Sequence, residues 1–355
     1  MDPIAPERLA ASLDALAGQR LYVHLETTAG AYTAGGFGAF SRNLVIVPER
    51  LMLRGTGPYR IGIRTAEGWL YAEGLTHAEI ADGRVFMEGH DDEGRLTVIL
   101  LLSREPLAVA GTARILPAGR PFVRPAGAAP PPTQETGVLV SSGHPDDETF
   151  GWGGTMALYS AAGVPLTQVT ATLGEMGRNL GDPPRTSRED LRRVRETELR
   201  DACDALGVGD LWLLGIWDKT SEFRDPEDLA EGIGRAIEAA RPSLILTSHP
   251  VHGGHPDHCS AGRATLLAVG RMPVASRPRV FCGMPSWVAE REGLTPNIVD
   301  ISSVREVKIA AIRAHRSQSE RMMRRFEAEQ ANLSPEMERR FSRESYIEIQ
   351  PDAIS

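Results

Sequence analysis

The stretch Ser141-Ser142-Gly143-His144-Pro145-Asp146-Asp147-Glu148 places one imidazole and two adjacent carboxylates directly after an apolar run, residues 138–140. The run is typical of a short buried strand, and the proline favours a tight turn after it. From such a turn His144 and Asp147 can reach one cation, which leaves Asp146 as a second carboxylate beside a bound water. The stretch therefore predicts a metal site at the end of a strand.

A second cluster of similar composition, His255-Pro256-Asp257-His258, follows the apolar run 244–246. With His258 as third ligand, His144 and Asp147 form a set of two imidazoles and one carboxylate that leaves a coordination position open for water. An open position is typical of a catalytic metal. Zn²⁺ is expected here, with Fe²⁺ as the alternative, because both accept these ligands.

The remaining acid and base groups of the two clusters predict how the reaction is catalysed. Asp146 is placed to take a proton from the attacking water as general base. His255 lies three residues before His258, so we expect it to face the same cavity. As an imidazolium it could stabilise a developing oxyanion and protonate a leaving amine. Asp257 is expected to orient His255.

The sequence around both clusters alternates between strand-like and helix-like segments. Strands are expected at 138–141, 166–173, 211–214 and 244–248, and helices at 153–162, 187–206, 228–240 and 257–269. This alternation predicts an α/β, Rossmann-like domain with a mainly parallel sheet and helices on both faces. Ligands of such folds bind beyond the carboxyl ends of the strands, where both clusters fall.

Two further polar groups, within 174–179 and 218–219, also follow predicted strands. An isolated loop charge is usually solvated, but these four side chains should converge on the metal. Glu175 and Asp218 are therefore predicted to bind sugar hydroxyls, and Arg178 and Lys219 are also predicted to bind the substrate.

The first part of the chain predicts a separate β domain. A helix at 7–16 is followed by strand-like runs about ten residues apart, at 21–25, 44–47, 59–63, 69–72 and 96–101. This spacing favours a mainly antiparallel small barrel or rolled sheet. Residues 90–94 have the composition of a metal motif, but they lie between two strand patterns and are typical of a hairpin turn.

Composition divides the chain and limits its partners. The proline-rich residues 116–136 have the composition of a stiff connector, which separates a domain at 1–115 from one at 137–355. A net charge of -8 argues against a nucleic-acid or anionic membrane surface and favours a small-molecule substrate. Three scattered cysteines, no leader pattern and no apolar run long enough for a membrane span predict a cytoplasmic protein. The sequence leaves a homo-oligomer open.

The two clusters together resemble the signature of the LmbE/PIG-L metal-dependent N-deacetylases, which remove acetyl groups from N-acetylglucosaminyl conjugates. The resemblance implies that His144, Asp147 and His258 are zinc ligands. It also implies that Asp146 is the general base and His255 the general acid or electrostatic partner. The substrate-binding arginine of the family would be Arg195. In this family some relatives carry an aromatic residue at the position of Gly253, where His252 or His249 is expected to fill similar space. His315, in a segment resembling a C-terminal family helix, is interpreted as structural or as lining the rim of the pocket.

Residues 172–181 and 214–223 resemble most the branch that deacetylates N-acetylglucosaminyl-malate in bacillithiol biosynthesis. Three cations near the pocket, Arg178, Arg195 and Lys219, would suit the carboxylates of malate. The alternatives are a thiol-conjugate amidase or a deacetylase of another N-acetyl amino sugar on the same scaffold. A sugar-binding or regulatory protein is a more distant alternative, because binding alone requires neither a general base nor an acid.

The first domain has a resemblance of its own. Residues 22–28, 58–60 and 68–77 are similar to a small bacterial β-protein family of unknown role. Members of that family are encoded beside such deacetylases, so the resemblance implies a natural fusion of two neighbouring gene products.

Overall fold

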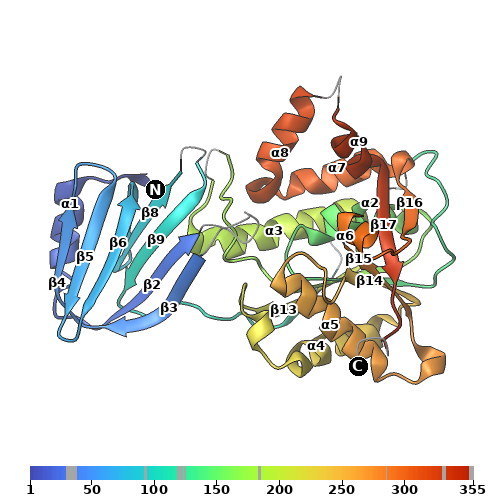
Figure 1. Cartoon of the computed structure of the whole chain (residues 1–355), viewed down its shortest axis with the longest axis horizontal. Coiled ribbons are helices and arrows are strands. Elements are labelled where there is room, and N and C mark those ends of the chain that lie inside the picture. The colour runs from blue at the N-terminus through green and yellow to red at the C-terminus, as the bar shows by residue number, and fades with distance from the viewer. Residues whose placement is uncertain are drawn as a thin grey trace. The chain divides into compact units, whose positions relative to one another are not determined.

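The computed structural model in Figure 1 describes residues 1–28, 38–91, 94–117, 123, 125–182, 185–284, 286–329 and 333–351. The chain forms two compact units. The first contains Met1–Val109 and Arg178–Ser187, and the second contains Ala110–Gly177 and Arg188–Ser355. Among the helices described, none is long and apolar enough to cross a membrane.

The first unit is built from antiparallel strands, as predicted. One sheet has the order β1-β7-β8-β9-β2-β3, and a smaller one has the order β4-β5-β6. Within the described residues the edges β1 and β3 do not pair with each other, so the larger sheet is open rather than a closed barrel. The elements are β1 (Asp2–Pro3), α1 (Pro6–Asp14), β2 (Leu21–Thr28), β3 (Gly38–Ile46), β4 (Pro48–Arg54), β5 (Tyr59–Thr65), β6 (Trp69–Leu75), β7 (His77–Ala81), β8 (Arg84–His90) and β9 (Leu96–Ser103).

The hairpin expected at residues 90–94 is confirmed in the part that is described. Strand β8 ends at His90, and β9 begins at Leu96 and runs antiparallel to it. The Asp91 carboxylate accepts a hydrogen bond from the backbone N–H of Arg95 at 2.8 Å, which closes the turn. Residues 92 and 93 of this motif lie outside the described residues.

The second unit is a mixed eight-stranded sheet of order β10-β13-β12-β11-β14-β15-β17-β16. Its five central strands, from β13 to β15, are parallel, which confirms the predicted Rossmann-like arrangement. The strands are β10 (Arg114–Pro117), β11 (Val138–Ser142), β12 (Leu166–Thr172), β13 (Asp210–Ile216), β14 (Leu244–Ser248), β15 (Arg279–Gly283), β16 (Asn297–Asp300) and β17 (Arg343–Glu348). The helices are α2 (Asp147–Ala161), α3 (Arg188–Leu206), α4 (Pro226–Ala240), α5 (Pro256–Gly270), α6 (Ser286–Arg291), α7 (Arg305–Ala314), α8 (Arg316–Ala328) and α9 (Pro335–Ser342).

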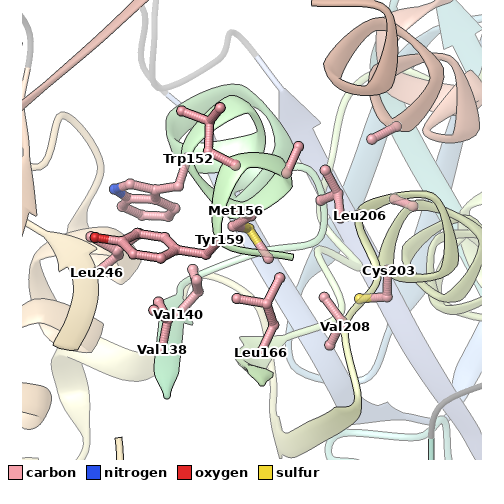
Figure 2. Packing of buried hydrophobic residues seen from close by; sticks show 14 of the residues in the cluster. Val138, Val140, Trp152, Met156, Tyr159, Leu166, Cys203, Leu206, Val208 and Leu246 are labelled. Carbon is pink, nitrogen blue, oxygen red and sulfur yellow. The ribbon is translucent and has the colours of Figure 1, made fainter. Parts of the chain in front are cut away.

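Helices cover both faces of this sheet because its central strands are apolar on both sides. Val138 and Val140 of β11 pack with residues of α2 and α3, and Figure 2 shows them facing Trp152 and Met156 of α2. Leu139, between the two valines, belongs to the opposite cluster, which is formed with α4 and α5. Strand β11 is therefore buried on both faces, in the middle of the core.

The order of the strands places a crevice at β11. From β11 the chain winds through β12 and β13 on one side, and then through β14 and β15 on the other. Strands β11 and β14 are parallel neighbours, so their carboxyl ends lie together at the point where the winding reverses. Ligands of doubly wound sheets bind at this switch point. The two predicted His/Asp clusters follow these two strands.

Helix α2 receives buried polar groups from the end of the chain. The Glu344 carboxylate accepts hydrogen bonds from the backbone N–H groups of Gly154 and Thr155 at 2.9 and 2.8 Å. The Lys308 ammonium donates to the Phe150 carbonyl oxygen at 3.2 Å and pairs with Glu344 at 2.6 Å. Lys308 of α7 and Glu344 of β17 thus tie the middle of α2 to later parts of the chain.

The proline-rich segment packs on the second unit where it is described. Strand β10 pairs antiparallel with β13, so residues 114–117 form an edge of the second sheet. The Ala129 N–H donates to Ser303 Oγ at 3.0 Å, and Thr133 Oγ1 is hydrogen-bonded to the Tyr159 hydroxyl at 2.6 Å. These contacts hold the described part of the expected stiff connector against the second unit, and proline spacing alone does not indicate them.

Candidate metal centre and active site

The three predicted ligands lie together at the switch point. Nδ1 of His144 lies 3.0 Å from Nε2 of His258. The Asp147 carboxylate is 3.1 Å from the same His258 nitrogen and 3.7 Å from His144 Nδ1. The backbone N–H of His144 donates to Asp147 at 2.8 Å, which fixes the carboxylate against the turn. Two imidazole nitrogens and a carboxylate that face one another form a donor set suited to a divalent metal.

The other nitrogen of His144 faces two buried carboxylates. Nε2 lies 3.0 Å from Asp218 and 3.1 Å from Asp257. Burial alone would lower the pKa of His144, but Asp218 raises it well above its ordinary value. A carboxylate behind a ligating histidine fixes its tautomer and orientation. Asp218 and Asp257 are therefore placed to orient His144.

Both of these carboxylates are held by the backbone. The N–H of Met176 donates to Asp218 at 2.9 Å, and the N–H of Lys219 donates to Asp257 at 2.8 Å. Ser221 donates its hydroxyl to Asp257 as well. Although burial opposes it, His144 lowers the pKa of Asp218 well below its ordinary value. Asp218, which the sequence predicts as a sugar partner, thus contacts a predicted ligand of the metal.

The described residues contain two groups of possible ligand atoms, and the atoms of each group lie within 4.8 Å of one another. One group is His144 with His255 and His258, and the other is His144 with Asp218 and Asp257. The two carboxylates of the second group already accept backbone hydrogen bonds. The side of His144 that faces His258 and Asp147 is the one where both remaining predicted ligands converge. We therefore regard that side as the one able to hold a metal.

Gly253 explains how His258 is oriented. Its carbonyl oxygen lies 3.0 Å from His258 Nδ1, so a proton on Nδ1 leaves the Nε2 lone pair for the cluster. A Cβ at Gly253 would lie only 2.9 Å from the His249 carbonyl oxygen, so a larger residue needs a local shift of the backbone. His249 and His252 lie against each other, with ring centroids 4.9 Å apart.

Asp146, the predicted base, begins α2 in a left-handed conformation with φ 98° and ψ -29°. Such a conformation costs roughly 1–3 kcal/mol for a residue other than glycine and is concentrated at functional sites. The Asp146 side chain is 19% exposed, and its Oδ2 lies 3.1 Å from Nη2 of Arg195. Burial raises the pKa of Asp146 to about 6, although Arg195 opposes the rise. A base with a pKa near neutrality can accept a proton at physiological pH.

Arg195, which the sequence predicts as a substrate ligand, is buried between the two catalytic turns. Its Nη1 donates to the Gly174 carbonyl at 3.0 Å, and its Nη2 donates to the Pro145 carbonyl and to Asp146. Only its Nε is without a partner among the described residues. Gly174 has φ +62°, and a Cβ there would lie 1.8 Å from Arg195 Nη1. Arg195 is thus placed to hold the base, with one donor left for a substrate.

His255 lies beside the predicted ligands, with ring centroids 4.8 Å from His144 and 5.2 Å from His258. Its Nδ1 accepts a hydrogen bond from the Asp257 backbone N–H at 3.2 Å. Burial, with a contribution from His144, lowers the pKa of His255 to about 4, so its imidazole is neutral at pH 7. The Asp257 carboxylate is closer to His144 than to His255, at 3.1 and 3.7 Å. Asp257 thus contacts His255 through its backbone N–H and more distantly through its carboxylate.

The other predicted substrate ligands have different positions. Glu175 is buried, and its carboxylate accepts from the Asp218 N–H at 3.3 Å. Lys219 has a left-handed backbone with φ 64° and supports Asp257 through its N–H. Arg178 belongs to the first compact unit, where burial and Arg95 lower its pKa. Glu175 and the backbone of Lys219 therefore contact Asp218 and Asp257, the two carboxylates beside His144.

Glu175 should destabilise the protein at alkaline pH. Burial, assisted by Asp218, raises its pKa from 4.5 to about 7. Below pH 4.5 the carboxyl is neutral in both folded and unfolded chains, whereas above pH 7 the folded protein must bury a charge. The free energy of unfolding is therefore highest in acid and falls by roughly 3 kcal/mol as the pH rises from 4.5 through about 7. We expect Glu175→Gln to raise the Tm more at pH 8 than at pH 5.

Thermal unfolding of purified protein at the two pH values measures this difference. Glu238→Gln, an exposed residue of α4, is the matched control and should change the Tm equally at both. An identical effect of Glu175→Gln at pH 5 and pH 8 would contradict the burial argument.

Glu148 and His315 support the base in a way that the sequence does not reveal. Glu148 accepts the Asp146 N–H at 2.9 Å and lies 2.6 Å from Nε2 of His315. Against the effect of burial, Glu148 raises the pKa of His315. Both residues are buried, which agrees with the structural interpretation of His315. Glu148 belongs to the first His/Asp cluster, but no local sequence pattern indicates its contact with His315, 167 residues away.

Two family models match the chain. The model described as "Protein of unknown function (DUF1806)" matches residues 3–107, and the PIG-L model, described as "GlcNAc-PI de-N-acetylase", matches residues 139–269. The probable N-acetyl-alpha-D-glucosaminyl L-malate deacetylase 2 of Bacillus subtilis (strain 168) is 43% identical over 210 residues, which cover 59% of this chain and 95% of the relative. The uncharacterized protein YojF of the same organism is 39% identical over 116 residues, which cover 31% of this chain and 100% of YojF.

Among solved structures, the N,N'-diacetylchitobiose deacetylase from Pyrococcus horikoshii is similar in fold. Its TM-score is 0.47 at 24% identity, over 62% of this chain and 86% of that chain.

The fold, the site and the relatives together define an α/β deacetylase with a His/Asp cluster able to hold a metal at the switch point of its sheet. Two separate B. subtilis proteins are matched along almost their whole length by two successive parts of this chain. The chain belongs to the PIG-L family of N-deacetylases and carries a DUF1806 domain before the catalytic one. The expected joining of two sequence families is thereby confirmed.

Proposed function

We propose that this protein hydrolyses N-acetylglucosaminyl-malate to glucosaminyl-malate and acetate, as a zinc-dependent step of bacillithiol biosynthesis in the cytoplasm. The observation that carries the proposal is the meeting of His144, Asp147 and His258 beside Asp146. The B. subtilis relative named as the malate conjugate deacetylase supports the choice of substrate, because this chain covers 95% of it.

His144, Asp147 and His258 would hold the metal, with Fe²⁺ as the alternative to Zn²⁺. When bound, the metal supplies Lewis acidity toward the acetamide carbonyl and toward water. Asp218 and Asp257 keep Nδ1 of His144 directed at the other two ligands. The Gly253 carbonyl does the same for His258 Nε2.

Asp146 accepts the proton of the attacking water. Its carboxylate is fixed by Arg195 and by the backbone of a left-handed turn, so it does not need to reorganise as the reaction proceeds. Partial exposure lets water reach it. The amine that leaves must gain a proton, and Asp146 carries one after the first step.

His255 assists at the oxyanion. Because its Nδ1 accepts the Asp257 N–H, the neutral ring carries its proton on Nε2 and can donate it to an oxygen. Its lowered pKa favours this neutral donor over the imidazolium that the sequence suggests. His255 thus polarises the acetamide oxygen, and Arg195 Nε remains as a donor for a sugar hydroxyl.

An amine-release assay tests the proposal. Protein purified without oxygen and analysed for metal is incubated with N-acetylglucosaminyl-malate, with the methyl glycoside of N-acetylglucosamine and with an N-acetylcysteine conjugate. Release of amine and acetate in equal amounts from the malate conjugate is expected, with slower release from the glycoside. Preferential cleavage of the cysteine conjugate would instead identify a thiol-conjugate amidase.

A further inference from the structure

A cavity of about 590 Å³ adjoins the predicted metal ligands within the second unit. Asp147 and His258 line it, and so do three arginines, Arg339, Arg340 and Arg343. This volume lies in the range that holds a small-molecule ligand. The cavity therefore joins the candidate catalytic cluster to a group of cations that sequence analysis did not single out.

Arg339 and Arg343 have neighbours that are packed in the core, while their own guanidinium groups make no hydrogen bond or ion pair among the described residues. Phe341, between them, is fully buried against Phe326, with ring centroids 4.5 Å apart. Glu344, directly after Arg343, is the carboxylate that bonds α2. Within the described chain no hydrogen bond or ion pair engages the guanidinium of Arg339 or Arg343.

The carboxylate paired in register with Arg343 has another partner. Asp300 of β16 lies opposite Arg343 in the strand pair. Its carboxylate accepts the Ser302 N–H at 2.9 Å. This hydrogen bond lowers the pKa of Asp300, and the charge of Arg343 also contributes to lowering it. Within the described residues no hydrogen bond or ion pair joins the side chains of Asp300 and Arg343, so the guanidinium can also turn to an anion in the cavity.

Trp152 adds an uncharged donor to the same cavity. Its side chain is only 3% exposed, yet Nε1 has no hydrogen-bond partner among the described residues. Figure 2 shows this nitrogen on the side of the indole away from Cys203 and Leu206. Because buried polar groups are nearly always satisfied, an indole N–H without a partner on a cavity wall indicates a ligand atom there.

We propose that Arg339 and Arg343 form the subsite for the carboxylates of the aglycone, while the acetamide lies at Asp147 and His258. The inference rests on the proposed function and names the residues that distinguish its substrate. Arginine binds carboxylates through paired, charge-assisted hydrogen bonds that a neutral aglycone cannot form. Arg195, whose two Nη groups are already occupied, is less suited to this role.

The test compares substrates in variants of the full chain. In Arg339→Gln and Arg343→Gln, the kcat/KM for N-acetylglucosaminyl-malate divided by that for the methyl glycoside is expected to fall about tenfold to a hundredfold per arginine. The double variant should lose most of the preference. Arg235→Gln, an exposed arginine of α4 outside the cavity, is the matched control and should retain the wild-type ratio. Metal content and Tm verify that each variant is folded.

The outcomes separate this inference from the proposed function. If the wild-type enzyme releases amine from neither substrate, the proposed function itself fails. If it prefers the malate conjugate and the double variant retains that preference, the arginine subsite is wrong. N-acetylglucosamine 1-phosphate is tested as a third substrate. If the enzyme prefers it to the malate conjugate, and this preference depends on the two arginines, the subsite binds a phosphate rather than a carboxylate.

Discussion

Changing His258 to alanine should remove the metal and the activity together. The substitution leaves only His144 and Asp147 of the proposed three ligands, and a pair of ligands holds a divalent ion weakly. It also leaves the Gly253 carbonyl without its 3.0 Å contact. The measurement is metal content per chain after gel filtration, alongside amine release from N-acetylglucosaminyl-malate.

His252→Ala is the matched control for this experiment. His252 is close to His258 in sequence but belongs to neither group of ligand atoms found in the described residues. The control should keep its metal. Full metal occupancy in His258→Ala would show that the metal binds elsewhere, for example at His144 with Asp218 and Asp257.

Asp146→Asn should keep the metal and lose turnover by about 10²–10⁴-fold, the contribution typical of a general acid–base group. Asparagine tolerates the left-handed backbone that Asp146 adopts, so the turn should remain intact. The amide can still accept a hydrogen bond from Arg195, but it cannot take a proton from water. Steady-state kinetics and metal analysis of the same preparation distinguish a base from a ligand.

Asp228→Asn, on the exposed side of α4, controls for the change of charge. If Asp146→Asn released the metal, Asp146 would be a ligand instead. Near-normal turnover would remove it from the mechanism altogether.

Much of the catalytic unit could be predicted because its information is local. An apolar run followed by a proline-containing turn specifies a strand end, and parallel strands bring their carboxyl ends to one edge. His144 and His258 are 114 residues apart, yet each is positioned by the strand before it, so their meeting follows from the topology.

The roles of single side chains were less predictable because they depend on long-range contacts. Arg195 was expected on the substrate, but the same charge that would attract a carboxylate ligand pairs with Asp146. The sequence predicts that Asp257 orients His255, and its carboxylate also lies near His144, at the shorter distance of 3.1 Å. A pattern of residue types gives the members of a charged cluster, whereas the pairing within it depends on ångström-scale geometry.

The arginines of the cavity had no sequence signal at all. They lie beyond the match to the PIG-L model, on α9 and at the start of β17, which pairs with β15. Neither a motif nor a helical or strand periodicity marks Arg339 or Arg343. Their relevance depends on a strand pairing that local propensity does not encode.

The bonds from Glu344 to α2 can form only late in synthesis. Glu344 is made 190 residues after Gly154, whose N–H it accepts. Until β17 has left the ribosome, the middle of the helix that begins at Asp147 lacks these partners. Because domains generally fold in order from the N-terminus, the β domain has time to fold before α2 gains these bonds. The contacts that tie α2 to β17 can form only after residue 344 has been made, later than strands β11 to β15.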